Sequence, residues 1–151
     1  MATSFHLQCV EAMAADIVAL GVAGLGEDQV YTRKLPYGRN ATLPCVLVSL
    51  PLNLGERMVG GDNAREDVQY PVQISFLVVE NQDLEADDDF DAVLVWREQL
   101  LLHYHNARLS GFASVDRVIS EPGQIIDLEH FKAGKLAGNI IAWCQGRRTR
   151  T

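Results

Sequence analysis

The chain has 151 residues and a formal net charge of −7, and 48% of its residues are hydrophobic and 22% charged. This length and composition are typical of a globular protein that buries a core without disulfides or structural metals. The negative charge argues against a protein that binds nucleic acid by neutralising phosphates, because that mode of binding needs a basic face. We therefore expect a single domain over residues 1–151.

The cysteines are three in number and far apart, at Cys9, Cys45 and Cys144. Each lies in an apolar run, which predicts burial as a small hydrophobic residue and argues against a disulfide framework. This predicts a reducing, intracellular compartment. The N-terminal segment lacks the pattern of a signal peptide, and no apolar stretch reaches the roughly 18 residues that span a bilayer, so we expect neither feature.

The first predicted element is a helix over residues 4–20 that Thr3 or Ser4 can cap. Its buried stripe consists of apolar residues at helical spacing: Phe5, Cys9, Val10, Met13, Ile17 and Leu20. The glycines that follow the helix indicate an exit and a turn rather than a phosphate loop, because no strand precedes them. Strands are then predicted over residues 29–35 and 45–50.

Residues 53–66 form the most loop-like segment of the chain, because they contain three glycines and few apolar side chains. Loops of this length without structure of their own are usually functional or disordered. The segment lies between two predicted strands, so we interpret it as a long hairpin loop. We expect it to project from the body of the protein and to become ordered only against a partner.

A long strand is predicted over residues 68–76, where five apolar residues alternate with polar ones or proline. Pro71 lies inside this strand and cannot donate to a sheet, which indicates an edge or a bulge there. An exposed edge invites pairing with another chain. An acidic turn follows, and the second amphipathic helix then begins near Phe90 and ends near Ala107.

The C-terminal third is predicted to contain strands over residues 115–120 and 136–145, with a short helical turn over 127–132. The basic tail, residues 146–151, is expected to be frayed. The chain order is thus helix, three strands, helix, two strands, without βαβ alternation. This order predicts an α+β fold, with a mainly antiparallel sheet of about five strands and two main helices packed on one face.

The acidic turn matches a calcium loop only in part. Asp83, Glu85 and Asp87 fit the first three ligand positions, but Asp88 stands where glycine is required and Leu94 where a bidentate glutamate is required. Carboxylates ahead of a helix also complement its positive end, which is the simpler explanation. The surplus charge is expected to face solvent or the lumen of an assembly, through Asp83, Glu85, Asp87, Asp88, Asp89 and Asp91.

Catalytic and metal motifs are not found in the sequence. His103 and His105 are two positions apart on a predicted helix, so they point in different directions and cannot share a metal. Cys144 lies in a strand beside Trp143, where a thiol is more often part of the core than a nucleophile. We therefore expect no enzyme activity, metal or cofactor, although a catalytic pair assembled only in three dimensions stays an open alternative.

Several segments together resemble small virion proteins of tailed phages, of the tail terminator and tail completion type. They are VYTRKLP at 30–36, LPCVLV at 43–48, YPVQI at 70–74, NQDL at 81–84, WRE at 96–98 and HN at 105–106. The resemblance covers most of the chain and rests on size, element order and scattered residues. It implies a small domain, an antiparallel sheet flanked by helices, that assembles as a hexameric ring.

Such a ring sits on the last ring of the tail tube, stops its growth and offers a docking surface to the head connector. The implied partners are copies of the chain, the tail tube protein and a connector or neck protein, while DNA passes through without specific binding. The implied location is the virion. The predicted subunit or tube interface consists of Asn53, Gly55, Arg57, Met58, Gly60, Gly61, Pro71, Arg147 and Arg148.

Two alternatives remain at this stage. One is a head–tail joining protein of the virion neck, and the other is a small cytosolic enzyme or ligand-binding domain. The segregation of charge motivates one more hypothesis, that Arg147, Arg148 and Arg150 contact the acidic turn of a neighbouring subunit.

Overall fold

The computed structural model describes residues 4–36, 41–62, 64–80, 86–127 and 135–149. The elements in chain order are α1 (Phe5–Leu20), the 3-10 turn η1 (Glu27–Gln29), β1 (Val30–Thr32), β2 (Cys45–Ser49), β3 (Arg57–Gly61), β4 (Arg65–Glu80), α2 (Ala86–His103), β5 (His105–Ala107), β6 (Arg117–Pro122) and β7 (Lys135–Thr149).

The strands of the described residues form one mixed sheet of seven strands. Its order is β1-β2-β4-β7-β6-β5, and β3 pairs with β4 as well. The β1–β2 pair is parallel and the other pairs are antiparallel. The α+β class is thereby confirmed, and the expected count of five strands is corrected to seven. The two additional strands are β3 and β5, and their short, polar or glycine-rich sequences lack an alternating apolar pattern.

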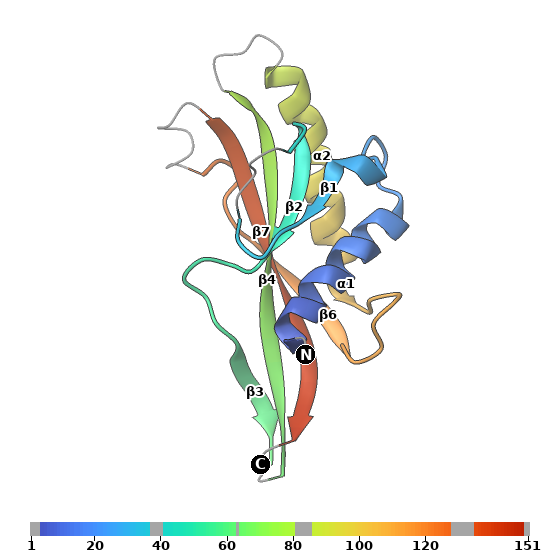
Figure 1. Cartoon of the computed structure of the whole chain (residues 1–151), viewed down its shortest axis with the longest axis vertical. Coiled ribbons are helices and arrows are strands. Elements are labelled where there is room, and N and C mark those ends of the chain that lie inside the picture. The colour runs from blue at the N-terminus through green and yellow to red at the C-terminus, as the bar shows by residue number, and fades with distance from the viewer. Residues whose placement is uncertain (1–3, 37–40, 63, 81–85, 128–134, 150–151) are drawn as a thin grey trace.

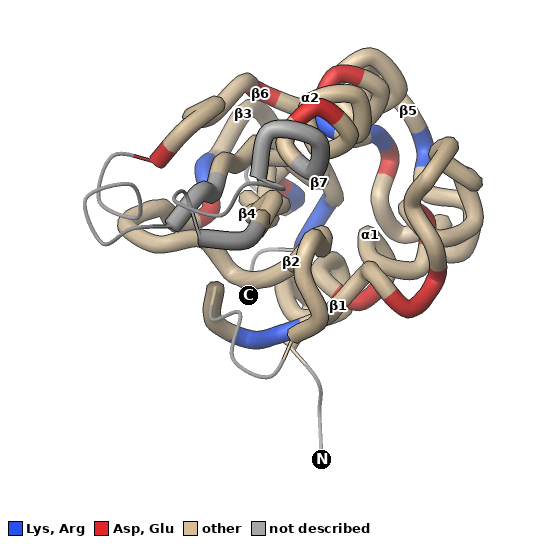
Figure 2. Tube along the Cα trace, turned by 90° about the horizontal axis from the view of Figure 1, so that it is seen from above, with Lys and Arg blue, Asp and Glu red and all other residues tan. Residues whose placement is uncertain are grey.

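Both helices pack on one face of the sheet, as the sequence predicts (Figure 1). Seen along the long axis, α1 and α2 lie on one side of the sheet, and the loops beside β3 and β6 lie on the other (Figure 2). The core between helices and sheet includes Met13 and Ile17 of α1, Trp96 and Leu100 of α2, and Ile74 of β4. The alternation of β4 directs its apolar side chains into this core.

The ends of the first helix differ in part from the prediction. Ser4 is the N-cap residue but makes no side-chain cap hydrogen bond, and Thr3 lies outside the described residues. Gly21 ends the helix with a φ of 66°, a left-handed conformation that glycine adopts without steric cost. The three cysteines are buried and free, as expected.

A buried carboxylate joins α1 to the segment that follows α2. The Tyr104 hydroxyl donates to Asp16 Oδ2 at 2.6 Å, and the Ser110 amide and hydroxyl both donate to Asp16 Oδ1 at 2.8 Å. Burial, followed by the hydrogen bond to Asp16, raises the pKa of Tyr104 far above its usual range. This cluster of three side chains accounts for a charged residue in the apolar stripe of the first helix.

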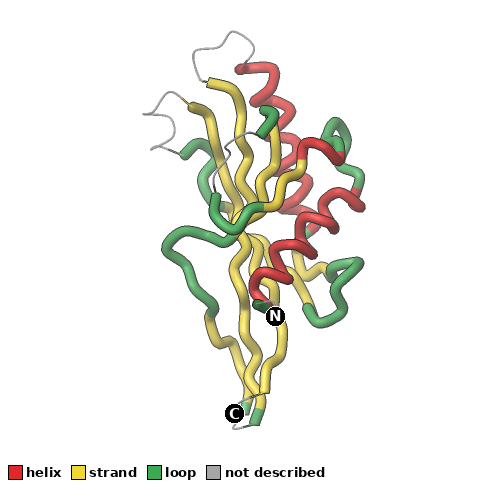
Figure 3. The backbone as a smooth tube through the Cα atoms, viewed as in Figure 1, coloured by secondary structure: helices red, strands yellow, loops and turns green. Residues whose placement is uncertain are grey.

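The two longest strands extend well beyond the helices. One half of β4 and β7 lies in the body of the protein, where β4 pairs with β2, and the other half projects with β3 as a narrow extension (Figures 1 and 3). Residues 146–149, expected to fray, are part of β7 and pair with β4 residues 65–68. Residues 128–132 of the expected helical turn lie outside the described part.

Candidate interaction surface on the arm

We call the projecting extension the arm, and it consists of residues 57–61, 65–70 and 143–149. β3 is exposed at every residue, and of the strands described it pairs only with β4. Its outer edge is therefore open, apart from a bulge at Val59 where the register with β4 shifts. The expectation that residues 53–66 order only against a partner is wrong, because pairing with β4 orders β3 within the chain.

The tip of the arm is a tight turn held by one carboxylate. Asp62 Oδ1 accepts hydrogen bonds from the backbone amides of Ala64 and Arg65, each at 2.8 Å. Gly61 has a φ of 125°, and a Cβ at that position would lie 2.4 Å from the Arg65 carbonyl oxygen. Only glycine fits this conformation and this space, so the hairpin turn depends on the residue type at position 61.

Two ion pairs link β4 to β7 across the arm. Arg147 lies directly opposite Asp67, with 3.0 Å between Nε and Oδ1, and Arg148 lies opposite Glu66 and is hydrogen-bonded to it. The hydrogen bond that each arginine donates to its carboxylate raises the pKa of that arginine above the usual range. Opposite charges at directly paired positions stabilise the strand pairing, here in a segment with little apolar burial.

One face of the arm and of the adjoining β6 carries most of the arginines of this region, and we call it the arginine face. Its charged residues are Arg57, Arg65, Arg117, Arg147, Asp67 and Glu121. Alternation places these residues on the side of the sheet that faces away from the helices. Four guanidinium groups thus lie among two carboxylates, and the nearby carboxylates of Asp62 and Asp116 also contribute to raising the pKa of Arg147.

A network of side-chain contacts holds the arginine face together. Arg57 lies over the ring of Trp143, 3.8 Å from its centroid, and donates to Gln69 Oε1 at 2.7 Å. Gln69 in turn donates to Gln145, and Arg117 donates to the same Gln145 oxygen at 3.1 Å. The polar side chains of four neighbouring strands are thus connected in one layer that covers Trp143, which is only 5% exposed.

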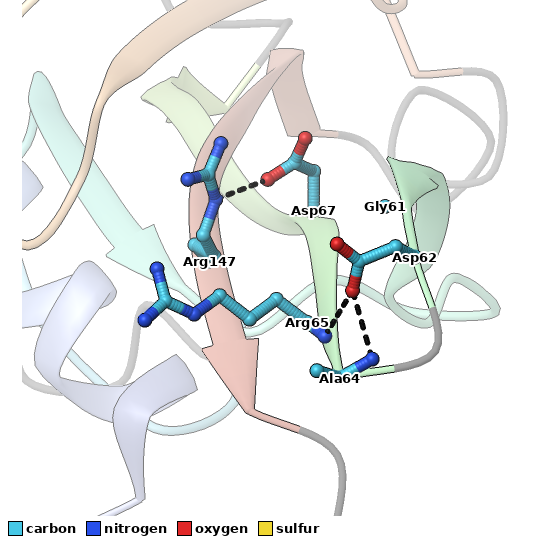
Figure 4. Close-up of a pocket in the computed structure, with 6 residues that line it drawn as sticks. All are labelled: Gly61, Asp62, Ala64, Arg65, Asp67 and Arg147. Carbon is cyan, nitrogen blue, oxygen red and sulfur yellow. Dashed lines mark hydrogen bonds and ion pairs between the residues drawn. The ribbon is translucent and has the colours of Figure 1, made fainter.

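The arginine face ends near the tip in a shallow, open pocket of about 280 Å³. Its lining residues come from the turn and from the two long strands: Gly61, Asp62, Ala64, Arg65, Asp67 and Arg147 (Figure 4). In this pocket Asp67 forms an ion pair with Arg147, and Asp62 accepts hydrogen bonds from the backbone amides of the turn. The two carboxylates of the pocket are therefore already paired within the arm.

The structure brings together most residues of the predicted interface. Arg57, Met58, Gly60 and Gly61 lie in β3, and Arg147 and Arg148 lie in the paired end of β7. Asn53, with a φ of 61°, and Gly55 lie in the exposed loop that leads from β2 to the arm.

Pro71 is the exception, and its interpretation as an exposed edge is corrected. It is buried, and it pairs with Trp143 in the middle of the β4–β7 ladder. On the other side of β4, residues 70–72 fall between the pairing with β2 and the pairing with β3. His6 of α1 donates to the Pro71 carbonyl oxygen there at 2.5 Å. Proline therefore occupies a gap inside the sheet, where its missing N–H leaves no donor unpaired.

The residues of the acidic turn are described only in part. Asp83 and Glu85 lie outside the described residues, and α2 includes Asp87, Asp88 and Asp89, whose side chains are not described. Asp91 is exposed on α2. The lumen prediction for these residues therefore stays a prediction.

Sequence reasoning missed the residues that complete the arginine face, namely Arg65, Asp67, Arg117 and Glu121. A signal was present in the sequence. The acidic pair Glu66-Asp67 comes directly before one long segment of alternating apolar residues, and the basic pair Arg147-Arg148 comes directly after another. Reading those two segments as paired strands predicts both ion pairs.

Within the described ranges, no group of three or more His, Cys, Asp and Glu side chains is placed to hold a metal ion. Among the helices described, none combines the length and the apolar character that crossing a bilayer requires. No protein-family model matches the chain, and no curated protein gives a significant match. The grounds for a function are therefore the arm, the arginine face and the resemblance of the sequence.

Proposed function

We propose that the protein is a structural subunit of a tailed-phage virion. It forms a ring of identical subunits at the head-proximal end of the tail tube, stops tube polymerisation and provides the docking surface for the head connector. It acts through surface contacts and not through catalysis. The resemblance to tail terminator and tail completion proteins supplies the setting, and the arm supplies the physical support.

The observation that carries the proposal is a folded arm that exposes an unpaired strand edge beside apolar side chains. Leu52 and Leu54 precede β3, and Met58 and Val59 lie in it, and these four side chains are 44% to 61% exposed. Open strand edges are liabilities for a monomer and are typical of contact surfaces, and exposed apolar side chains beside such an edge add area that a partner can bury. The arm therefore fits a protein that functions in contact with other proteins.

The charge of the chain fits the passage of DNA through a ring. Like charges repel, and at physiological salt this repulsion extends over roughly 8 Å. A subunit with a net charge of −7 that directs acidic residues to a lumen lets DNA slide without adhering to the wall.

The first test is the mass of the purified protein, measured by sedimentation over a range of concentrations and in the presence of tail tubes. A ring is expected, with six subunits as the implied number. A strict monomer that binds a small ligand in a closed pocket would contradict the proposal.

The second test is the tail morphology of virions that lack the protein. Overlong tail polymers are expected if the protein terminates the tube. Tails of normal length that remain unattached to heads would instead identify a head–tail joining protein of the neck.

A further inference from the structure

Two of the free cysteines lie together in the core, one on a helix and one on a strand. Cys9 is in the second turn of α1, Cys144 is in β7, and both are fully buried. Their thiols are hydrogen-bonded to each other. This hydrogen bond, followed by burial, raises the pKa of Cys144 well above its usual value, so the closed core holds Cys144 as the neutral thiol.

The packing of α1 on β7 accounts for this contact independently of the thiols. The ring of Phe5 lies over Gly146, where a Cβ would be 3.1 Å from Phe5 Cζ, so the glycine lets the helix approach the strand closely. Four helical residues later, about 6 Å along the axis, comes Cys9. Two strand residues before Gly146, about 6.6 Å away, comes Cys144. Because α1 runs away from the arm while β7 runs toward its tip, both steps go the same way, and the two cysteines meet (Figure 1).

We propose that Cys9 and Cys144 are an oxidation site, at which a peroxide converts the two thiols into one disulfide that ties α1 to β7. The sulfur of one deprotonated cysteine attacks the peroxide, the O–O bond breaks, and a sulfenic acid and a first water form. The sulfur of the other cysteine attacks the sulfenic sulfur, the S–S bond forms, the S–O bond breaks, and a second water leaves. The two thiols lose two electrons and two protons, and the peroxide takes up both.

The route to this buried pair is the start of α1. Ser4, the N-cap residue, makes no side-chain hydrogen bond to the helix, and the first turn contains no acidic residue. A helix start that lacks both stabilising contacts opens more readily than a capped one. Opening of the first turns exposes Cys9 and breaks the hydrogen bond that holds Cys144 as the thiol. The pair is therefore inert while the helix is closed and reacts when its start opens.

The third cysteine provides an internal comparison. Val46 and Val48 of β2 belong to the core beneath the helices, so alternation directs Cys45 to the opposite face of the sheet. Cys45 is as fully buried as the other two cysteines, and burial raises its pKa as well. The sheet separates its thiol from theirs. Burial is thus common to all three cysteines, and only the proximity of a second thiol sets Cys9 and Cys144 apart.

The test treats the folded full-length chain with hydrogen peroxide, alkylates the remaining thiols in denaturant and digests the chain with trypsin. The cysteines fall in separate tryptic peptides, over residues 1–33, 40–57 and 136–147. We expect one disulfide, between the first and the last peptide, and alkylated Cys45 in the middle one. Dithiothreitol should restore all three thiols. Disulfides that include Cys45, links between two copies of the chain, or three cysteines without any link would overturn the proposal.

Oxidation of the chain in concentrated urea is the control for the role of the fold. Loop closure there favours the pair that is nearest in sequence, so the link from Cys9 to Cys45 should dominate. A main link from Cys9 to Cys144 in urea as well would overturn the role of the fold. Cys45→Ala is the matched variant, because it removes an equally buried thiol and should still form the disulfide, whereas Cys9→Ala should leave Cys144 without a link. The peptide map of the native chain decides the matter by itself if a variant fails to fold.

The disulfide should also slow the opening of the helix. Amide hydrogen exchange of residues 5–9 is expected to become slower by at least about tenfold in the oxidised chain, because the opening that exposes those amides is then tied to β7. Unchanged or faster exchange would overturn the tie between α1 and the strand. These measurements do not depend on self-association, so the oxidation site and the proposed ring can fail separately.

Discussion

The buried carboxylate of Asp16 allows a quantitative prediction about stability. Tyr104→Phe removes a 2.6 Å hydrogen bond from a hydroxyl to a carboxylate, and both residues are less than 10% exposed. Hydrogen bonds to charged groups contribute about 1.5–3 kcal/mol, so we expect that loss in the free energy of unfolding. Asp16→Ala removes the same bond, releases Ser110 and leaves the buried Tyr104 hydroxyl without a partner. The lost hydrogen bond and the orphaned hydroxyl together are expected to cost about 3–5 kcal/mol.

The double variant Asp16→Ala/Tyr104→Phe decides whether this reasoning is right. It removes the orphaned hydroxyl, so its cost should be smaller than the sum of the single costs by about 1–3 kcal/mol. Urea unfolding followed by circular dichroism measures all three variants, and Ser110→Ala serves as the control because Ser110 is exposed and water can replace it. Single costs that add to within about 0.5 kcal/mol would refute the coupling.

Three other predictions concern the second face of the sheet and the arm. Burial raises the pKa of Cys45 from 9.0 to about 11, so the folded state disfavours the thiolate. Between those two pH values unfolding should become easier by about 2–3 kcal/mol, and Cys45→Ala should flatten this dependence in pH-resolved urea titrations. Gly61→Ala should speed amide hydrogen exchange in β3 and spare the body, while Gly55→Ala, which meets no atom within 4 Å, should not; equal rates would contradict the turn geometry. Arg57→Ala should expose Trp143 and shift its fluorescence to the red, with a stability loss of about 0.5–2 kcal/mol; unchanged emission would contradict the stacking.

The elements with a strong apolar period could be predicted from the sequence. The first helix and the central part of β4 carry regular apolar spacing, and tertiary packing follows that spacing directly. The glycine-rich β3 could not be recognised as a strand, because its sequence RMVGG has no alternation to bury. It becomes a strand only because β4 continues past the body and offers an edge for pairing.

Pro71 shows why local rules fail at a particular position. The absence of an N–H was correctly interpreted as a break in strand pairing, but a break can lie inside a sheet as well as at its rim. Only the placement of β2 and β3 along the same side of β4 decides between the two, and that placement depends on contacts distant in sequence. The ring, its partners and the role of the acidic turn stay predictions.

The continuous pairing of β4 with β7 has a mechanical consequence. Their register runs without a break from Arg65 opposite Thr149 to Leu77 opposite Ala137. A slip of one residue would turn either Ile74 or Ile140 out of the core, so the apolar interior fixes the alignment of strands far outside it. The projecting end therefore behaves as a lever clamped at its base, and any force applied at the tip is transmitted to the core through a ladder that cannot slide.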